Sequence, residues 1–450
     1  MRLQISALLL AAAVQTTGSS RTLFEGARLI AGDGRPPIEN AAFLVENDRI
    51  IRVGRKGEID LPRGGTRIDL SGKTVMPGLI NLHGHAGYLK GVTFSADNFT
   101  SDNVIDQLNR CLYYGVVAMA SIGTDPGDLP YQLRDEPHPG ALFRTAGRGF
   151  AMPNASTGNA AMRSVPYGVT TEDEARRYVQ ELAAKKPDFL KIWVDDRNRT
   201  VQKLTPPLYR AIIDEAHKRK IRVMAHEYYL EDARDLVRAG VDGFLHMVRD
   251  AEMDDDLVRM MKEKRVFITP NMGTSEAGTY VGKPAWLDDP ALAETASPDM
   301  IRKVADVYAA RATARGNAPA AQTPRPAELS FARQQRSLAK LNAAGVTIAL
   351  GDDTGIENTF FGYGDHRELE IMVGAGMTPM QAIVAATRTP AALLHLDRLG
   401  TIAPGKSADF LVLNANPLDA VANTRKIARV YQRGREIDRA AMRAAWANGR

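Results

Sequence analysis

Short apolar runs recur between about positions 77 and 399, where they alternate with stretches of helical periodicity. This alternation is typical of βαβ units, whose strands form a parallel sheet. We count eight runs, and eight is the number of strands that closes a β/α barrel. The runs are Val75–Leu82, Val116–Ile122, Leu142–Ala146, Phe189–Val194, Ile221–Ala225, Gly243–Leu245, Val266–Thr269 and Val346–Leu350.

The segments before and after that region have a different pattern, with short alternating strands between turn residues. Each segment is too short to bury a core alone, so we expect the two to pack together. We therefore predict an α/β fold in which a TIM-like (β/α)8 barrel, residues 76–399, is inserted in a small β-sandwich built from residues 21–75 and 400–438. The strand candidates of the sandwich are Thr22–Ile30, Ala41–Val45, Arg49–Val53, Ala408–Leu413 and Ala428–Gln432.

Residues 284–326 interrupt the barrel pattern between the seventh and eighth runs. The stretch is rich in alanine and proline, and Asp299–Arg315 is its one good helix candidate. An insertion of this kind projects from a barrel loop, either as a lid or as a disordered surface loop. The sequence leaves both alternatives open.

The first 20 residues have the three-part pattern of a secretory signal peptide. Arg2 precedes an apolar run from Ile5 to Val14, and small and polar residues follow from Thr16 to Ser20. The apolar run is too short to span a bilayer. We expect cleavage between Ala13 and Ser20 and an exported protein, periplasmic if the source is bacterial, that is not held in a membrane.

Composition narrows the class of protein further. With 450 residues, 44% hydrophobic and 25% charged, the chain matches soluble globular proteins and not disordered, collagenous or multi-span membrane proteins. The net charge of +5 arises from 58 basic against 53 acidic residues, too small an excess to indicate nucleic-acid binding. A single cysteine excludes an intramolecular disulfide. The oligomeric state, including a homo-oligomer, stays open.

Four of the eight histidines lie at the carboxyl ends of predicted barrel strands. His83 and His85 end the first run, and side chains two apart on a strand point to the same side. His226 ends the fifth run, His246 ends the sixth, and Asp353 follows the eighth. Barrel enzymes assemble their active sites on this rim from separate strands. We therefore expect these five side chains to converge on a metal site.

Lys191 lies inside the apolar run Phe189–Val194, where a free ammonium is expensive to bury. Two alternatives would remove that cost. In one, the ammonium pairs with a buried carboxylate. In the other, the neutral amine adds carbon dioxide and becomes a carbamate whose two oxygens bridge two cations.

Together these residues resemble the amidohydrolase superfamily, in particular its imidazolonepropionase-like and Xaa-Pro dipeptidase-like branch. The resemblance covers nearly the whole chain after the signal segment. It rests on Pro77–His85, Phe189–Trp193, Ala225-His226, His246, Gly351–Asp353, Ala375–Pro379, Ala385–Thr387 and Gly405–Asp409.

The resemblance implies a distorted (β/α)8 barrel with a β-sandwich and a binuclear metal centre, usually zinc. Carried over by position, it assigns His83 and His85 to the more buried ion, and His226 and His246 to the more exposed ion. An N6-carboxylated Lys191 would bridge the two ions. Asp353 would ligate the buried ion and accept the proton of the nucleophile.

The chain departs from the family pattern at two positions. Asn81 stands where members often have aspartate, which affects only the support behind the ligands. Asp352 stands where many members have threonine. Its extra charge either raises the pKa of Asp353 or faces away from the centre.

Such a centre predicts metal-assisted hydrolysis. Imidazole and carboxylate ligands suit zinc, and a bound zinc ion lowers the pKa of water from about 15.7 to about 7. A metal-bridging hydroxide would attack a carbonyl, and Asp353 would carry the proton to the leaving nitrogen. We expect an amide of a small molecule as substrate, such as a dipeptide, an N-acyl amino acid or a cyclic amide. The alternatives are an ester or lactone on the same centre, or a non-catalytic barrel that binds a metal or ligand.

Rim residues supply weaker candidates for substrate binding. Tyr228 could donate a hydrogen bond to the developing oxyanion, and Tyr229 could contact the substrate, although loop packing explains either side chain. Arg148 and Arg249 lie in rim loops and could bind a substrate carboxylate with two hydrogen bonds, although surface ion pairs explain both.

Overall fold

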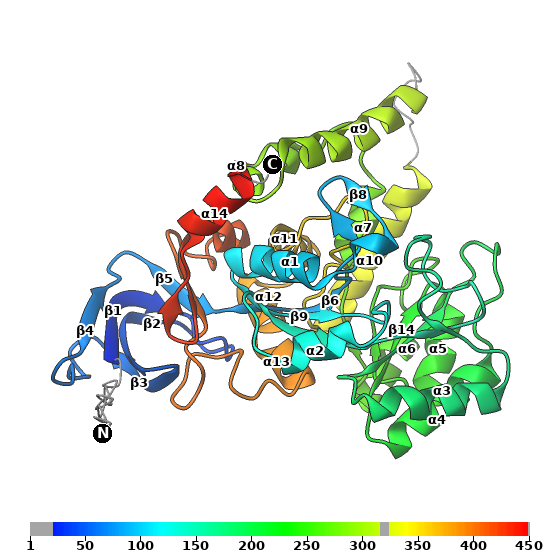
Figure 1. Cartoon of the computed structure of the whole chain (residues 1–450), viewed down its shortest axis with the longest axis horizontal. Coiled ribbons are helices and arrows are strands. Elements are labelled where there is room, and N and C mark those ends of the chain that lie inside the picture. Colours follow the sequence, from blue (N-terminus) through cyan, green and yellow to red (C-terminus); the bar gives the residue numbers. More distant parts are fainter. Residues whose placement is uncertain (1–20, 316–323, 449–450) are drawn as a thin grey trace, which may run out of the picture.

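The computed structural model describes residues 21–315 and 324–448, so the predicted signal peptide lies outside the described residues. Figure 1 shows a small β-unit, formed by blue N-terminal and red C-terminal segments, beside a larger α/β body. Within the described residues, no helix has both the length and the apolar character needed to cross a membrane.

The small unit is one sheet of eight strands built from N-terminal and C-terminal parts of the described chain. Its order is β19-β18-β17-β5-β1-β2-β3, and β4 pairs with β1. The antiparallel pair β5 and β17 joins the N-terminal and C-terminal parts. The strands are β1 (Arg21–Leu29), β2 (Ile38–Glu46), β3 (Arg49–Arg55), β4 (Thr66–Asp69), β5 (Thr74–Pro77), β17 (Phe410–Leu413), β18 (Ile427–Gln432) and β19 (Arg435–Glu436).

Aromatic rings fill the core of this sheet. Phe24 of β1 stacks on Phe43 of β2 with ring centroids 4.9 Å apart, and its edge meets Tyr431 of β18 at 5.1 Å. Two strands separate β1 from β18 in the sheet order, and flat neighbouring strands lie about 4.8 Å apart. The sheet must therefore curl strongly, so that its two ends enclose a common core.

The larger body contains parallel strands in two arcs. One arc has the order β10-β9-β6, and the other has the order β12-β11-β13-β14-β15-β16. A short antiparallel pair, β7 (Leu89–Lys90) and β8 (Thr93–Phe94), lies outside them. The arcs contain β6 (Leu79–Gly84), β9 (Val116–Ser121), β10 (Leu142–Thr145), β11 (Phe150–Ala151), β12 (Tyr167–Gly168), β13 (Leu190–Val194), β14 (Val223–Glu227), β15 (Gly243–Phe244) and β16 (Phe267–Ile268).

Isolated bridges and backbone hydrogen bonds, in place of regular ladders, join the two arcs. The eighth predicted run, 346–350, bridges β16 through Ile348 and accepts a hydrogen bond from Leu82 of β6 at Leu350 (2.9 Å). At the other junction the Asp188 amide donates to the Thr145 carbonyl (3.0 Å). The ring of strands is thus irregular at two places, and the eighth run is not a regular strand.

One predicted strand is wrong. The apolar run Val75–Leu82 divides into β5, which belongs to the small sheet, and β6, which belongs to the barrel strands. Gly78 lies at the break, where a Cβ atom would lie 2.4 Å from the Val117 side chain. The predicted boundary at residues 75 and 76 therefore falls inside β5, and the other domain boundaries stay predictions.

Helices connect and cover the parallel strands. Many begin with a side-chain cap, as where the Thr171 hydroxyl accepts a hydrogen bond from the Glu174 amide. The helices around the strands are α1 (Ser101–Tyr113), α2 (Leu129–Asp135), α3 (Glu172–Ala184), α4 (Pro206–Lys218), α5 (Leu230–Ala239), α6 (Asp255–Lys264), α7 (Met272–Ala277), α10 (Pro326–Ala344), α11 (Tyr363–Gly374), α12 (Pro379–Ala386) and α13 (Arg388–Leu393), with α14 (Arg439–Asn448) at the C-terminal end.

The described part of the insertion, up to residue 315, is helical. It contains a 3-10 turn, Ala285–Asp288, then α8 (Pro290–Ala293) and α9 (Pro298–Arg315), which confirms the predicted helix. Val304 and Tyr308 of α9 are buried, and the helix extends away from the barrel strands in Figure 1. This part is therefore not an irregular loop, and a role as a lid stays a prediction.

Candidate metal centre

His83 and His85 come from the end of β6 and meet on one carboxylate. Their Nε2 atoms lie 3.3 and 3.2 Å from Oδ1 of Asp353. Gly84 between them packs closely against Met119, because a Cβ atom there would lie 2.4 Å from that side chain. The alternation predicted from the sequence therefore places both imidazoles on the same side of the strand.

Asp353 follows the eighth run with a left-handed backbone (φ 58°), a conformation that aspartate tolerates better than most residues. Burial alone would raise its pKa, but the His83 and His85 rings and the Lys191 ammonium hold the pKa below its usual value. The carboxylate is thus ionised and available to a cation.

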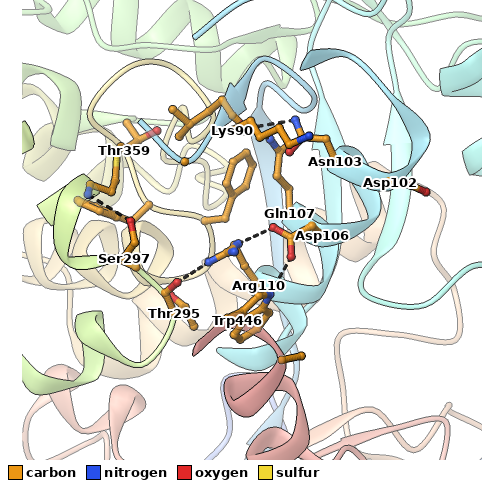
Figure 2. A pocket seen from close by; sticks show the side chains of 17 residues that line it. Lys90, Asp102, Asn103, Asp106, Gln107, Arg110, Thr295, Ser297, Thr359 and Trp446 are labelled. Carbon is orange, nitrogen blue, oxygen red and sulfur yellow. Dashed lines mark hydrogen bonds and ion pairs between the residues drawn. The ribbon is translucent and has the colours of Figure 1, made fainter. Parts of the chain in front are cut away.

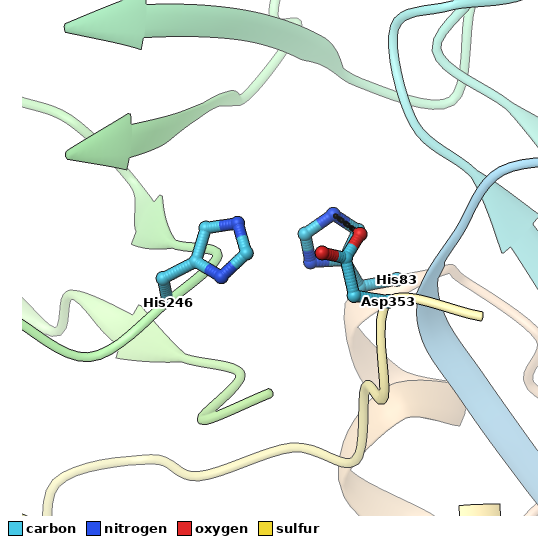
Figure 3. A group of neighbouring side chains, drawn as sticks. All are labelled: His83, His246 and Asp353. Atoms are coloured by element: carbon cyan, nitrogen blue, oxygen red, sulfur yellow. Dashed lines mark ion pairs between the residues drawn. The ribbon is translucent and has the colours of Figure 1, made fainter. Parts of the chain in front are cut away.

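His246, just after β15, completes a group that fits one cation. The ligand atoms of His83, His246 and Asp353 all lie within 4.8 Å of one another. Figure 3 shows the two imidazoles facing each other, with the carboxylate beside His83. Burial lowers the pKa of both histidines well below the usual value. Burial thus favours the neutral form of both rings, which is the form that binds metals.

His226 at the end of β14 lies next to His246, with ring centroids 4.4 Å apart. Its Nε2 atom lies 2.9 Å from Oδ2 of Asp195 and 3.0 Å from a terminal nitrogen of Arg249. Burial lowers the pKa of His226 to about 4. Burial would raise the pKa of Asp195, but the His226 hydrogen bond outweighs it and brings the pKa to about 2.

Lys191 on β13 is 1% exposed. Its Nζ lies 4.7 Å above the Trp193 ring, and no carboxylate of the described residues comes within ion-pair distance. Burial lowers the pKa of the amine to about 7. The predicted ion pair is therefore absent from the described part of the chain, whereas a neutral amine is accessible near neutral pH.

Contacts thus link five of the six predicted ligands, and Lys191 interacts electrostatically with His83 and Asp353; the structure also adds residues that sequence reasoning missed. The Leu245 carbonyl lies 3.0 Å from His83 Nδ1, and the Thr124 hydroxyl lies 2.8 Å from His85 Nδ1. Such contacts orient metal-binding histidines. Thr124 follows β9 within three residues, so its position after a strand end is the only sequence signal.

The two departures from the family pattern form one contact. The Asn81 amide donates to Oδ1 of Asp352 at 2.6 Å, and the Asn81 oxygen accepts from the His83 backbone amide at 2.8 Å. Asp352 therefore faces Asn81 and not the histidines. Its pKa rises to about 7, chiefly through burial. The structure thus favours the alternative in which Asp352 faces away from the centre, and the net pKa of Asp353 stays below its usual value.

The four candidate substrate-binding residues on the rim differ in whether other side chains and carbonyls already occupy their polar groups. The Tyr229 hydroxyl donates to Asp196 at 2.8 Å, and the Arg148 Nε donates to the Val165 carbonyl at 2.6 Å while its guanidinium stacks on a tyrosine. Tyr228 lies beneath Arg249, whose guanidinium is 4.9 Å from the ring centroid. Tyr229 and Arg148 therefore hold loops together, and substrate contacts for all four residues stay predictions.

Several buried polar atoms at this centre have no partner in the described residues. They include Nε2 of His83, which lies 3.3 Å from Asp353 Oδ1 without forming a hydrogen bond, and both carboxyl oxygens of Glu227 on β14. Burial raises the pKa of Glu227 to about 8, which favours its protonated form. Buried polar groups are normally satisfied, so the unpartnered His83 nitrogen beside the Asp353 carboxylate fits a divalent cation.

Another cavity, of about 510 Å³, lies between α1, α14 and the start of α9 (Figure 2). It contains none of the six predicted ligands. Two of its charged groups are engaged with each other: Asp106 accepts hydrogen bonds from Arg110 and from the Trp446 indole, both at 2.7 Å. No histidine is among the described residues that line the cavity, so it lacks the nitrogen ligands of the histidine cluster.

Parallel strands that present histidine, lysine and aspartate at one rim define a β/α-barrel scaffold with a cluster suited to divalent cations. The chain belongs to the amidohydrolase family, whose sequence model matches residues 143–437. It is 25% identical over 402 residues to the imidazolonepropionase of Streptomyces griseus subsp. griseus, a match that covers 85% of this chain and 88% of that protein.

Solved structures agree with this assignment. A putative prolidase from Bifidobacterium longum has a TM-score of 0.71 at 26% identity, and the match covers 96% of this chain and 98% of that chain. A Xaa-Pro dipeptidase with methionine in its active site has a TM-score of 0.71 at 21% identity, covering 93% and 100%, and shows the same fold. The predicted family, fold class and hydrolysis of carbon–nitrogen bonds are confirmed.

Proposed function

We propose that this chain is an exported hydrolase that binds two divalent cations, zinc by preference, and cleaves an amide bond of a small molecule. The substrate class comprises dipeptides, N-acyl amino acids and cyclic amides. The observation that carries the proposal is the buried group of His83, His246 and Asp353, whose ligand atoms lie within 4.8 Å of one another. Three further nitrogen donors, on His85, His226 and Lys191, surround this group.

Each side chain has a role in the proposal. His83, His85 and Asp353 hold the more buried ion, and His226 and His246 hold the more exposed one. The Lys191 ammonium would lose one proton to solvent, and its neutral amine would add carbon dioxide with loss of a second proton; the resulting carbamate could supply an oxygen ligand to each ion. Its pKa of about 7 supports this step, because the amine that adds carbon dioxide must be neutral.

Bound divalent cations supply a Lewis acid for the substrate carbonyl and lower the pKa of water from about 15.7 towards about 7. Asp353 takes the proton of the attacking water and delivers it to the leaving nitrogen. The Tyr228 hydroxyl donates a hydrogen bond to the carbonyl oxygen as negative charge develops there.

Metal analysis and a paired substrate screen test this function. The wild type should carry two divalent ions per chain and hydrolyse amides of the proposed class. Asp353→Asn should lose turnover by about 10²- to 10⁴-fold, the range for a general acid or base. Ester or lactone hydrolysis without amide hydrolysis, or two bound ions without any turnover, would contradict the proposal.

Asp352→Asn is the matched control. Asp352 is the neighbouring buried carboxyl, and asparagine retains the oxygen that accepts from Asn81 and from the Thr354 amide. We expect this variant to keep both ions and most of its turnover. Export is tested separately by sequencing the N-terminus of the mature protein, which should begin between residues 14 and 21.

A further inference from the structure

Two charged side chains compete for one nitrogen of His226. Asp195, directly after β13, places Oδ2 at 2.9 Å from His226 Nε2. Arg249, three residues after His246, places a terminal N–H nitrogen at 3.0 Å from the same atom. The Asp195 side chain is 12% exposed and that of His226 is 16% exposed, so water competes little with either contact.

The two contacts require different forms of the imidazole. A neutral imidazole carries one N–H and one lone pair. Asp195 accepts hydrogen bonds only, so it favours the form with hydrogen on Nε2 and the lone pair on Nδ1. Arg249 donates hydrogen bonds only, so it favours the lone pair on Nε2 and hydrogen on Nδ1. In this second form neither nitrogen is open to a cation, because one is protonated and the other is occupied.

We propose that Asp195 is a positioning residue that selects the form of His226 able to bind a cation through Nδ1, and that Arg249 opposes this selection. The inference rests on the proposed metal centre, and it concerns only the ion that His226 and His246 hold. The ion at His83, His85 and Asp353 should not depend on Asp195, because none of those side chains contacts it among the described residues.

Asp195 also supports its own loop, which the choice of variants must take into account. Its Oδ1 accepts from the Arg197 amide at 2.8 Å. That loop contains three consecutive residues with left-handed backbones, Arg197, Asn198 and Arg199. Asp195→Asn can keep the bond to Arg197 while it replaces the acceptor facing His226 with an N–H donor. Asp195→Ala removes both contacts.

The test measures the stoichiometry and affinity of Zn²⁺ and Co²⁺ by chelator competition in the full-length protein, without reference to turnover. We expect Asp195→Asn and Asp195→Ala to keep one ion and to bind the second about 10- to 100-fold more weakly, the usual effect of removing a residue that orients a metal ligand. Adding Arg249→Met to Asp195→Ala should restore much of that affinity. No donor among the described residues then hydrogen-bonds to Nε2 of His226, so the ring can again carry its hydrogen on Nε2 and its lone pair on Nδ1.

Asp196→Ala is the matched control for disturbance of the loop. The Asp196 carboxylate accepts hydrogen bonds from the Arg199 amide at 3.0 Å and from the Tyr229 hydroxyl at 2.8 Å. The Asp196→Ala variant should bind the second ion as the wild type does. Wild-type affinity in both Asp195 variants, or no recovery in the double variant, overturns the inference alone. A wild type that binds fewer than two ions overturns the proposed function and this inference with it.

Discussion

Replacing Lys191 with methionine tests how much the buried lysine charge lowers the free energy of unfolding of the metal-free protein. The side chain is 1% exposed, and its Nζ contacts the Trp193 ring but no carboxylate within the described residues. Methionine is similarly long and unbranched, and it fills the same space without a charge. The substitution therefore removes a buried ammonium while it leaves the packing almost unchanged.

The expected magnitude follows from the pKa of this lysine. Burial lowers the pKa to about 7 from the ordinary value of 10.5. The folded state therefore binds fewer protons than the unfolded state between those pH values, and stability increases with pH across this window. At 1.36 kcal/mol per unit, burying the amine costs about 4 kcal/mol at pH 7, about 2 kcal/mol at pH 9, and little above pH 10.5.

Urea unfolding of chelated protein in carbonate-free buffer measures this difference. Lys191→Met should be the more stable protein at pH 7, and its advantage should shrink by about half at pH 9. With divalent cations and bicarbonate the order should reverse, because the variant lacks a ligand. Lys426→Met, at an exposed position, is the control and should show no such pH dependence. The reasoning would be refuted if the metal-free variant were less stable than the wild type at pH 7. It would also be refuted if the difference in free energy of unfolding between the two did not depend on pH.

Three further predictions concern the rim, the small sheet and the cations. Tyr228→Phe should lower kcat by about 10²-fold in steady-state kinetics. Tyr229→Phe should change kcat little, because the Tyr229 hydroxyl already donates to Asp196. A larger loss of kcat in Tyr229→Phe than in Tyr228→Phe would contradict these roles. Phe24→Ala should cost about 3–5 kcal/mol in urea unfolding, because the ring is buried against three others, and the exposed Ile51→Ala should cost less than about 0.5 kcal/mol. Chelation should lower the melting temperature and abolish turnover, with both restored by added Zn²⁺; an unchanged melting temperature would argue against structural binding of the ions.

The convergence of the six side chains could be predicted because strand direction determines it. His226 and Lys191 lie far from His83 in the sequence, but each belongs to an apolar run whose neighbours are parallel. The carboxyl ends of such strands meet at one rim. The alternation of His83 and His85 on β6 followed from the same geometry.

Other features depend on contacts that the sequence pattern does not contain. The Pro77-Gly78 pair is a turn signal inside the apolar run, but only the pairing of β5 with β17 and the hydrogen bond from Gly78 to Asp409 show that its two halves belong to different sheets. The direction of Asp352 depends on Asn81, which lies 271 positions away. The contact between Asp195 and His226 depends on a loop with left-handed residues, for which no periodicity exists.

The most direct test of the metal centre is a crystal structure of the purified full-length protein, with anomalous scattering measured at the zinc edge. We predict two anomalous peaks on this rim, one beside His83, His85 and Asp353 and one beside His226 and His246, with planar density continuing from Lys191 Nζ between them. A single peak, or a bare lysine amine with two ions present, would contradict the bridged centre.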